Sequence, residues 1–188
     1  FTLGGGAPVA TTPVSGATAI PGAPIISSAT HPDPFGWYAK NTPLISWDLP
    51  EFATGVAYSI DKNPLGSPGA LSKGKVSFFQ SAVLSDGEWY AHVRFLSSAG
   101  WGSISHYRLG IDTAPPTSLL ITDATGYADD GTLHAQLLAE DALSGIGYFD
   151  VSVDGAAPVR FEPVGMNVYV SKPLSEGQHL LFAVAYDK

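Results

Sequence analysis

Residues 86–116 read DGEWYAHVRFLSSAGWGSISHYRLGIDTAPP and contain two predicted strands, the turn between them and a domain boundary. From Trp89 onward apolar and polar residues alternate, which predicts a strand with one buried and one solvated face. The segment 97–102 supplies turn chemistry, and alternation resumes over 105–111, so the two segments predict a β-hairpin. The residues expected on its buried faces are Trp89, Ala91, Val93 and Phe95 in the first strand and Ser105, Tyr107, Leu109 and Ile111 in the second.

The hairpin ends at DTAPP (112–116), which predicts a domain boundary near residue 113. Two successive prolines lack backbone donors and fix φ, so they end a sheet. Residues 23–113 and 114–188 are each long enough for an ordinary domain. Residues 1–22 are rich in Gly, Pro and Thr and carry no charge, so they are expected to be an interdomain linker or a donor segment.

Strand signals also lie on both sides of the hairpin, and no segment has convincing helical periodicity. Turn signals recur roughly every ten residues, which is typical of an antiparallel sandwich. We therefore predict an all-β chain of two tandem antiparallel β-sandwiches. The other expected strands lie within 24–30, 43–49, 56–61 and 75–84 in the first domain, and within 117–123, 133–140, 148–155, 159–163, 167–170 and 176–187 in the second.

Four segments, in this order, make residues 23–113 resemble a fibronectin type III domain: ISW at 45–47, VAY at 56–58, WYAHVRF at 89–95 and AGWG at 99–102. The resemblance implies that Trp47 packs in the core from the second strand. The chain departs from the family at Ser97, where Asn is common, and in a long insertion over His31–Tyr38.

Residues 114–188 resemble a bacterial immunoglobulin-like domain in DALSGI (141–146), VSVDG (151–155) and EGQHLLFAVAYD (176–187). The resemblance implies that 176–187 is the penultimate strand and that the last strand is missing at the C-terminus. An open sheet edge of this kind is a state that proteins avoid. We expect either that the chain is a fragment of a longer protein or that another copy donates a strand, with Thr11–Ile20 as the donor.

A narrower resemblance rests on THPDPFGWY (30–38), SWDLP (46–50) and the run from Trp101 to Pro116. These segments look like a module in surface-protein sequences of ultrasmall uncultured bacteria. There the module lies between other β-modules.

Composition limits the partners and the location. The net charge of −8 and the pI near 4.8 argue against nucleic-acid binding, which needs clustered Lys and Arg. The chain has no cysteine, so disulfides, thiolate metal sites and cysteine nucleophiles are excluded. Charged residues make up only 14%, a composition common in secreted β-proteins, and no apolar segment is long enough for a membrane helix. We expect an extracellular or cell-surface location without membrane insertion.

No sequence motif indicates catalysis, since phosphate loops, HExxH pairs, GxSxG elbows and EF-hand spacing are all lacking, and we expect a protein that is not an enzyme. The histidines are far apart in sequence, and all except His31 are placed on strand faces that should see solvent. His92 and His106 could meet across the hairpin, where we expect a solvated pair rather than a metal site. The remaining two are His134 and His179.

Acidic residues gather at strand ends in the second domain. Calcium prefers oxygen ligands, so a calcium ion could brace that edge. Turn-forming Asp residues explain the same pattern without a metal, and we prefer that interpretation. The weak calcium candidates are Asp123, Asp129, Asp130 and Asp141, with Glu140 adjacent.

Three large aromatic residues, Trp37, Tyr38 and Trp101, are expected in loops at the ends of the first sandwich. Exposed there, their rings could stack on sugars, as in a carbohydrate-binding module. The preferred alternative is that they cover the ends of the core or form the interdomain contact.

These observations predict a non-catalytic structural or adhesive module of a larger cell-surface protein, acting as a spacer or an assembly unit. The alternatives are a carbohydrate-binding module and an accessory region of an exported enzyme. The expected partners are neighbouring domains, other surface proteins or copies of the chain, with glycans as a further possibility. Apart from the weak calcium candidates, no cofactor is expected.

Overall fold

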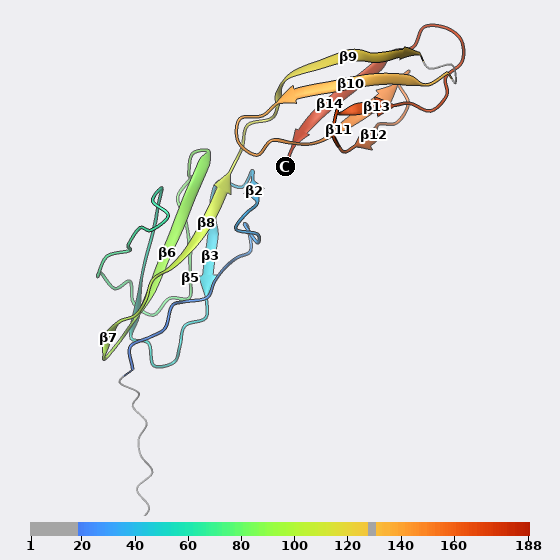
Figure 1. Cartoon of the computed structure of the whole chain (residues 1–188). Coiled ribbons are helices and arrows are strands. Elements are labelled where there is room, and N and C mark those ends of the chain that lie inside the picture. The colour runs from blue at the N-terminus through green and yellow to red at the C-terminus, as the bar shows by residue number, and fades with distance from the viewer. Residues whose placement is uncertain (1–18, 128–130) are drawn as a thin grey trace, which may run out of the picture.

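The computed structural model describes residues 19–127 and 131–188, and all regular secondary structure within them is β-strand. The strands form two groups that lie end to end, joined by one short crossing of the chain (Figure 1). Each group consists of two sheets, and no sheet contains strands from both groups. The prediction of an all-β chain with two tandem β-sandwiches is confirmed. All strand pairs are antiparallel except the pairing of β2 with β8.

The first sandwich places its sheets in the orders β1-β3-β5 and β2-β8-β6-β4. If β2 and β7 are left out, the remaining strands correspond, in chain order, to strands A, B, C, E, F and G of an immunoglobulin-type sandwich. Their division between the two sheets, A-B-E and C-F-G, is the one found in such sandwiches. Its strands are β1 (Ile26–Ser28), β2 (Trp37–Tyr38), β3 (Leu44–Trp47), β4 (Gly55–Asp61), β5 (Phe78–Gln80), β6 (Gly87–Ser97), β7 (Gly100–Trp101) and β8 (Ser105–Ile111).

The core of the first sandwich follows the alternation of the hairpin. Val93 of β6 and Leu109 of β8 are fully buried, as predicted for that face. Trp47 of β3 is also buried, and its indole N–H donates to the carbonyl of Val76 at 2.9 Å, so the polar atom of the ring is satisfied inside the core. The other buried apolar residues of this core are Ile45, Ala53, Val56, Ala91, Phe95 and Tyr107.

The segment before β3 is held against β8 by side chains of β8. The Tyr107 hydroxyl donates to the carbonyl of His31 at 2.6 Å, and the Arg108 guanidinium donates to the carbonyls of Pro34 and Gly36. These bonds hold residues 31–36 close enough for the next two residues, β2, to pair with β8 in parallel. The expectation of an irregular loop through residue 38 is therefore wrong at its end.

The second sandwich has the sheet orders β13-β10-β9 and β12-β11-β14. Its fully buried core is smaller and consists of Ala135, Leu137, Phe149 and Val151, all on faces that the alternation predicts. The strands are β9 (Thr117–Tyr127), β10 (Leu133–Glu140), β11 (Ile146–Val153), β12 (Val159–Phe161), β13 (Val168–Val170) and β14 (Leu181–Asp187).

Of the predicted linker or donor segment, residues 1–18 lie outside the described part of the chain. Residues 19–24 run beside the β6–β7–β8 turns. The Ser97 hydroxyl donates to the carbonyl of Ala19 at 2.9 Å, and the Ser105 hydroxyl donates to that of Pro24. Ser97 therefore holds the segment that leads into the first sandwich. The fibronectin type III family often has Asn at this position.

Two leucines of the first sandwich give a matched test of its core. Leu109 is fully buried, whereas Leu65 is 79% exposed. We expect Leu109→Ala to lower the free energy of unfolding by about 2–5 kcal/mol, because it removes buried methyl groups and leaves a cavity. Leu65→Ala should change it by less than about 0.5 kcal/mol. All four tryptophans precede residue 113, so tryptophan fluorescence in a urea titration reports on this sandwich alone. Equal effects of the two substitutions would contradict the assignment of the core.

Candidate functional sites at the domain junction and the open sheet edge

The junction between the sandwiches (residues 112–116) begins with a buried carboxylate. Asp112 is only 4% exposed, and its backbone N–H donates to the carbonyl of Tyr38 in the first sandwich at 3.1 Å. Its carboxylate Oδ2 accepts a hydrogen bond from the backbone N–H of Ser144 at 2.9 Å, in the turn between β10 and β11. Asp112 is therefore fixed by its backbone to one sandwich and by its side chain to the other.

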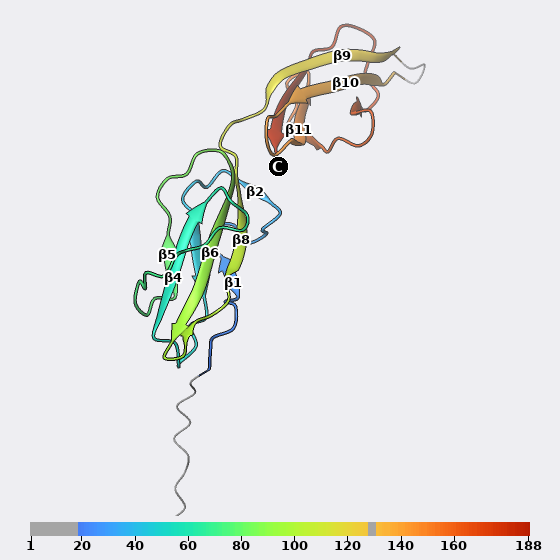
Figure 2. The same cartoon turned by 60° about the vertical axis from the view of Figure 1, so that its left-hand side comes forward.

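The rest of the junction is restrained as well. The backbone N–H and the hydroxyl of Thr113 both donate to Asp86 Oδ1, at 3.2 and 2.9 Å, just before β6. The backbone N–H of Ala114 donates to Asp112 Oδ1 at 3.3 Å. Pro115 and Pro116 then fix φ at two residues before β9 starts. Figure 2 shows how short this crossing is. These bonds and the two prolines restrain the backbone of the junction.

Three carboxylates converge beside the junction. Asp112, Asp141 of the β10–β11 turn and Asp187 at the end of β14 each offer one oxygen, and these oxygens lie within 4.8 Å of one another. None of the ion pairs formed among residues 19–127 and 131–188 includes them. Such a set of oxygen atoms is the chemistry that calcium prefers.

The weak calcium candidates of the sequence are only partly brought together. Asp141 belongs to the three-carboxylate group, whereas Asp123 lies within β9 and is not a member. Asp129 and Asp130 lie outside the described residues, so their part of the prediction stays a prediction. Asp112 and Asp187 were missed because they are 75 positions apart in sequence. The only signal for Asp112 was its place before the two prolines.

The pKa values of two of the carboxylates, Asp187 and Asp141, are shifted in opposite directions. Burial, followed by the negative charges of Asp112 and Asp141, raises the pKa of Asp187. Burial also raises the pKa of Asp141, but hydrogen bonds outweigh that effect and lower its pKa overall. These bonds come from the backbone N–H groups of Gly145 and Leu143, at 2.6 and 3.1 Å, and from Ser144. Burial and the charges of Asp112 and Asp141 thus oppose the ionisation of Asp187.

Replacement of Asp187 by Asn tests this repulsion. A carboxyl whose pKa is raised on folding destabilises the fold when ionised, so Asp187→Asn should raise the unfolding temperature at pH 7 in the presence of a chelator. As the pH falls, Asp187 becomes protonated in the folded protein before it does in the unfolded chain, because its pKa is raised by folding. The advantage of the variant should therefore shrink and disappear below the ordinary value of 3.8. Asp48→Asn, at an exposed site, is the control.

Calorimetry between pH 3 and 8 measures these differences. A variant without advantage at pH 7 would contradict the repulsion. A variant less stable than the parent only when calcium is added would show that the three carboxylates bind that ion.

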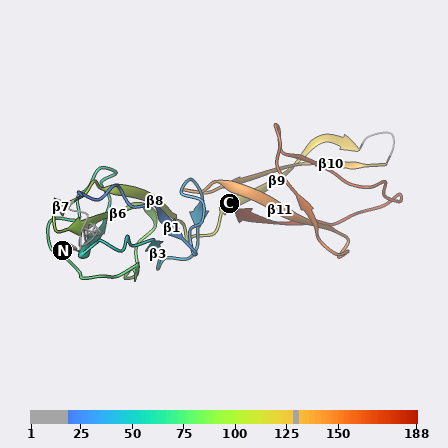
Figure 3. The same cartoon turned by 90° about the horizontal axis from the view of Figure 1, so that it is seen from below.

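The second candidate site is the free edge of β14. In the first sandwich β6 is paired on both sides, with β4 and β8. In the second sandwich β14 is paired with β11, and no strand among the described residues pairs with its other edge. Figure 3 shows that this strand ends near the junction, where the C-terminus lies. The immunoglobulin-like resemblance predicts a further strand at this position.

The interior beside this edge is incompletely covered. Ile121 of β9 is paired with the buried Leu137, so it faces the interior, yet it remains 38% exposed. Ala183 of β14 is paired with the buried Val151 and is also only partly buried. An added strand beside β14 would pair with its free edge. The open edge is therefore a place where an extended segment could complete the core.

Amide hydrogen exchange tests whether the edge is free. In an antiparallel edge strand, every second N–H points away from its partner. We expect alternate amides of Leu181–Asp187 to exchange rapidly, while those of β6 between Trp89 and Val93, which is paired on both sides, are all protected. NMR of the exchanging protein resolves the single residues. Uniform protection along β14 would show that another segment covers its edge.

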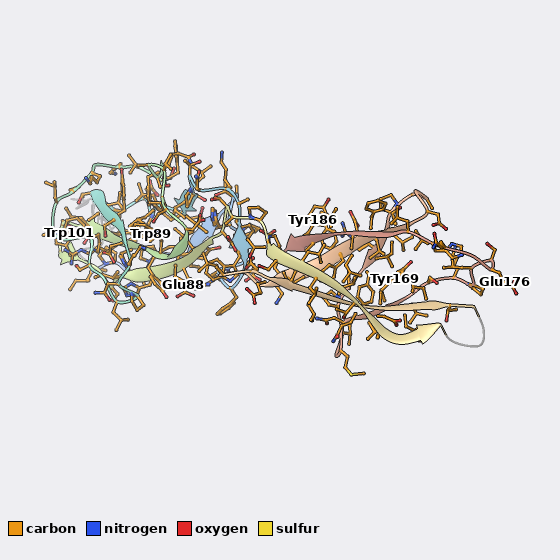
Figure 4. The ribbon with its side chains drawn as sticks, turned by 90° about the horizontal axis from the view of Figure 1, so that it is seen from above. Glu88, Trp89, Trp101, Tyr169, Glu176 and Tyr186 are labelled. Carbon is orange, nitrogen blue, oxygen red and sulfur yellow. The ribbon has the colours of Figure 1, made fainter. Side chains whose placement is uncertain are left out.

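The predicted sugar-stacking aromatics are not free loop residues. Trp37 and Tyr38 form β2 and Trp101 belongs to β7, and all three side chains are half-buried rather than exposed. The Arg108 guanidinium lies 4.9 Å from the Trp37 ring centre and that of Arg94 lies 4.6 Å from Trp101, so a cation occupies one face of each ring. Figure 4 places Trp101 at the end of the first sandwich far from the second. Glycan binding by these residues stays a prediction.

The histidine predictions need one correction. His92 and His106 do meet across the hairpin, with their Nδ1 atoms 2.7 Å apart. His92 is not solvated, however, and is 0% exposed. The loop after β4 covers it, because a Cβ added to Gly66 would lie 2.5 Å from His92 Nε2. Strand alternation predicts the face of His92 correctly but contains no information on a loop that crosses this face.

No known protein-family model matches the chain, and no curated protein is significantly similar to it in sequence. Among solved structures, the chain is similar to the fibronectin(III)-like modules of CbhA from Clostridium thermocellum, with a TM-score of 0.47 and 16% identity over 87% of this chain and 86% of that chain. It is also similar to the FN1–FN3 domains of chicken CNTN1, with a TM-score of 0.37 and 13% identity over 90% of this chain and 63% of that one.

Proposed function

We propose that the chain is a non-catalytic spacer of a larger cell-surface protein and that it holds its neighbouring domains at a fixed distance and angle. The observation that carries the proposal is the buried carboxylate of Asp112, which accepts a hydrogen bond from Ser144 across the junction. A spacer needs such a contact, because two sandwiches on a free linker would bend at their joint.

The energetics of the junction favour a single arrangement. A hydrogen bond to a charged group contributes about 1.5–3 kcal/mol, and a buried carboxylate left without its donor costs at least as much. Opening the joint would break the bond from Ser144 while the restraints on Thr113 and the two prolines remained. The closed arrangement is therefore favoured over bent ones, and the two sandwiches act as one rod.

The surface chemistry supports a place outside the cell. Charged residues make up only 14% of the chain, a composition common in secreted β-proteins. Within the described residues there is no helix of the length and apolar character that a membrane crossing requires. The open edge of β14 suits contact with a neighbouring domain or another surface protein, so the spacer would also be an assembly unit.

The two alternative functions lack a supporting observation in the structure. A carbohydrate-binding module needs accessible ring faces, and Arg94 and Arg108 each take one face of the candidate tryptophans. Polysaccharide binding by the parent chain that is lost in Trp101→Ala would support a carbohydrate-binding module. An accessory region of an exported enzyme would require a catalytic domain in the same polypeptide, which the parent gene would reveal.

Distance measurements between the sandwiches test the spacer. The chain has no cysteine, so spin labels can be placed at Leu65→Cys and Met166→Cys, two exposed positions in different sandwiches. We expect a narrow distance distribution by pulsed dipolar EPR, and a clearly broader one when Asp112→Ala is added, because the bond to Ser144 is lost. The exposed Asp48→Ala is the control and should leave the width unchanged. A broad distribution in the parent chain would contradict the proposal.

A further inference from the structure

The loop between β13 and β14 (residues 171–180) passes from one sheet of the second sandwich to the other. Its first half is bonded to the chain at the start of β10. The backbone N–H of Ser171 donates to the carbonyl of Leu133 at 2.9 Å. The backbone N–H of Leu174 donates to the carbonyl of Gly131 at 3.0 Å. The first half of the loop is therefore fixed to the sheet that contains β10.

The second half of the loop is bonded to the turn between β11 and β12. In this turn Asp154 and Gly155 both have positive φ, 52° and 73°, and the backbone N–H of Ala156 donates to the carbonyl of Val153 at 3.0 Å. Asp154 Oδ1 accepts a hydrogen bond from the backbone N–H of Leu180 at 2.8 Å, and the backbone N–H of Asp154 donates to the carbonyl of Leu180. The turn therefore holds the carboxylate of Asp154 in place beside the loop.

The ring of His179 lies between two oxygen atoms. Its Nδ1 is 2.6 Å from Asp154 Oδ2, and its Nε2 is 2.8 Å from the carbonyl oxygen of Ser175. The side chain of His179 is only 9% exposed, so protein atoms rather than solvent surround it. A neutral imidazole has one N–H and can donate to only one of these oxygens, while its other nitrogen would present a lone pair to the second. Only the protonated ring, with two N–H groups, satisfies both oxygens.

We propose that His179 is a pH-sensitive latch for the β13–β14 loop. The protonated ring donates to Asp154 and to Ser175 at the same time and holds the loop closed. When the ring loses a proton, the charged carboxylate keeps the remaining N–H, because it is a stronger acceptor than a neutral carbonyl, and the bond to Ser175 is lost. That bond is the only one that residues 175–178 form with the described part of the chain, so its loss releases the middle of the loop.

The groups that face His179 set the direction of the switch. The hydrogen bond with Asp154, followed by the bond with the Ser175 carbonyl, raises the pKa of His179 against the opposite effect of burial. The same bond from His179 is the main cause that lowers the pKa of Asp154, the one charged residue of the β11–β12 turn. Lys172 and Glu176, the other charged residues of the loop, are exposed and form no ion pair with His179.

The pH range of the latch follows from these directions. Since the pKa of His179 is raised on folding, the latch stabilises the fold fully below the ordinary value of 6.5 and ceases to do so as pH rises through the raised value. The lowered pKa of Asp154 keeps its carboxylate ionised until pH falls below 3.8. The loop is therefore closed at mildly acidic pH. Figure 4 places Glu176 of this loop at the end of the second sandwich far from the first, so the surface that responds to pH lies there.

NMR of the His179 ring in the full chain tests whether the two oxygens hold the proton. We expect its titration midpoint to lie above 6.5. Asp154→Asn should move this midpoint to lower pH, and it preserves the turn because Asn tolerates positive φ. The exposed Asp48→Asn is the matched control and should leave the midpoint unchanged. A midpoint at or below 6.5 in the parent chain, or one that Asp154→Asn does not lower, would overturn the proposal.

A spin label measures the release of the loop. The chain has no cysteine, so a label can be placed at the exposed Glu176→Cys. We expect its EPR spectrum to show greater mobility as pH rises through the His179 midpoint, whereas a label at the exposed Leu65→Cys should not respond. His179→Gln should remove the pH dependence, because an amide side chain does not titrate. A label at position 176 that ignores pH in the otherwise unchanged chain, or responds equally in His179→Gln, would show that His179 is not the latch.

Discussion

The buried carboxylate of Asp112 is the constraint on which the arrangement of the two sandwiches depends. Its backbone N–H donates a hydrogen bond to the carbonyl of Tyr38 in the first sandwich. Its carboxylate accepts a hydrogen bond from the backbone N–H of Ser144 in the second. A charge in this position must be hydrogen-bonded, since burial without donors would be costly. The proposed fixed orientation of the two sandwiches depends on these hydrogen bonds.

At the same position Asp112 takes part in an unfavourable electrostatic interaction. Asp112 brings its charge close to Asp141 and Asp187, and this charge adds to the larger effect of burial in raising the pKa of Asp187. The carboxylate of Asp112 therefore has two opposing effects at the junction. It accepts the hydrogen bond from Ser144, and it repels the carboxylate of Asp187 at the end of β14. That strand is itself an edge strand, because one of its edges has no partner among the described residues.

Strand alternation made the fold predictable, whereas the sites depend on contacts that local sequence does not contain. Val93 and Leu109 lie on the predicted buried face because a strand has a period of two residues. His92 also lies on its predicted face, yet the loop that contains Gly66 crosses over it. Asp112 resembled an ordinary turn residue before two prolines. Its burial results from the docking of a second domain, which no periodicity within one strand can reveal.

The proposed spacer requires that the two sandwiches move as one body. Residual dipolar couplings of backbone amides test it most directly, because they report the orientation of every strand relative to a common frame. We expect that β6 and β8 of the first sandwich and β10 and β11 of the second fit one alignment tensor with the arrangement in Figure 1. Two tensors of clearly different magnitude would mean that the sandwiches reorient independently, which would contradict the claim.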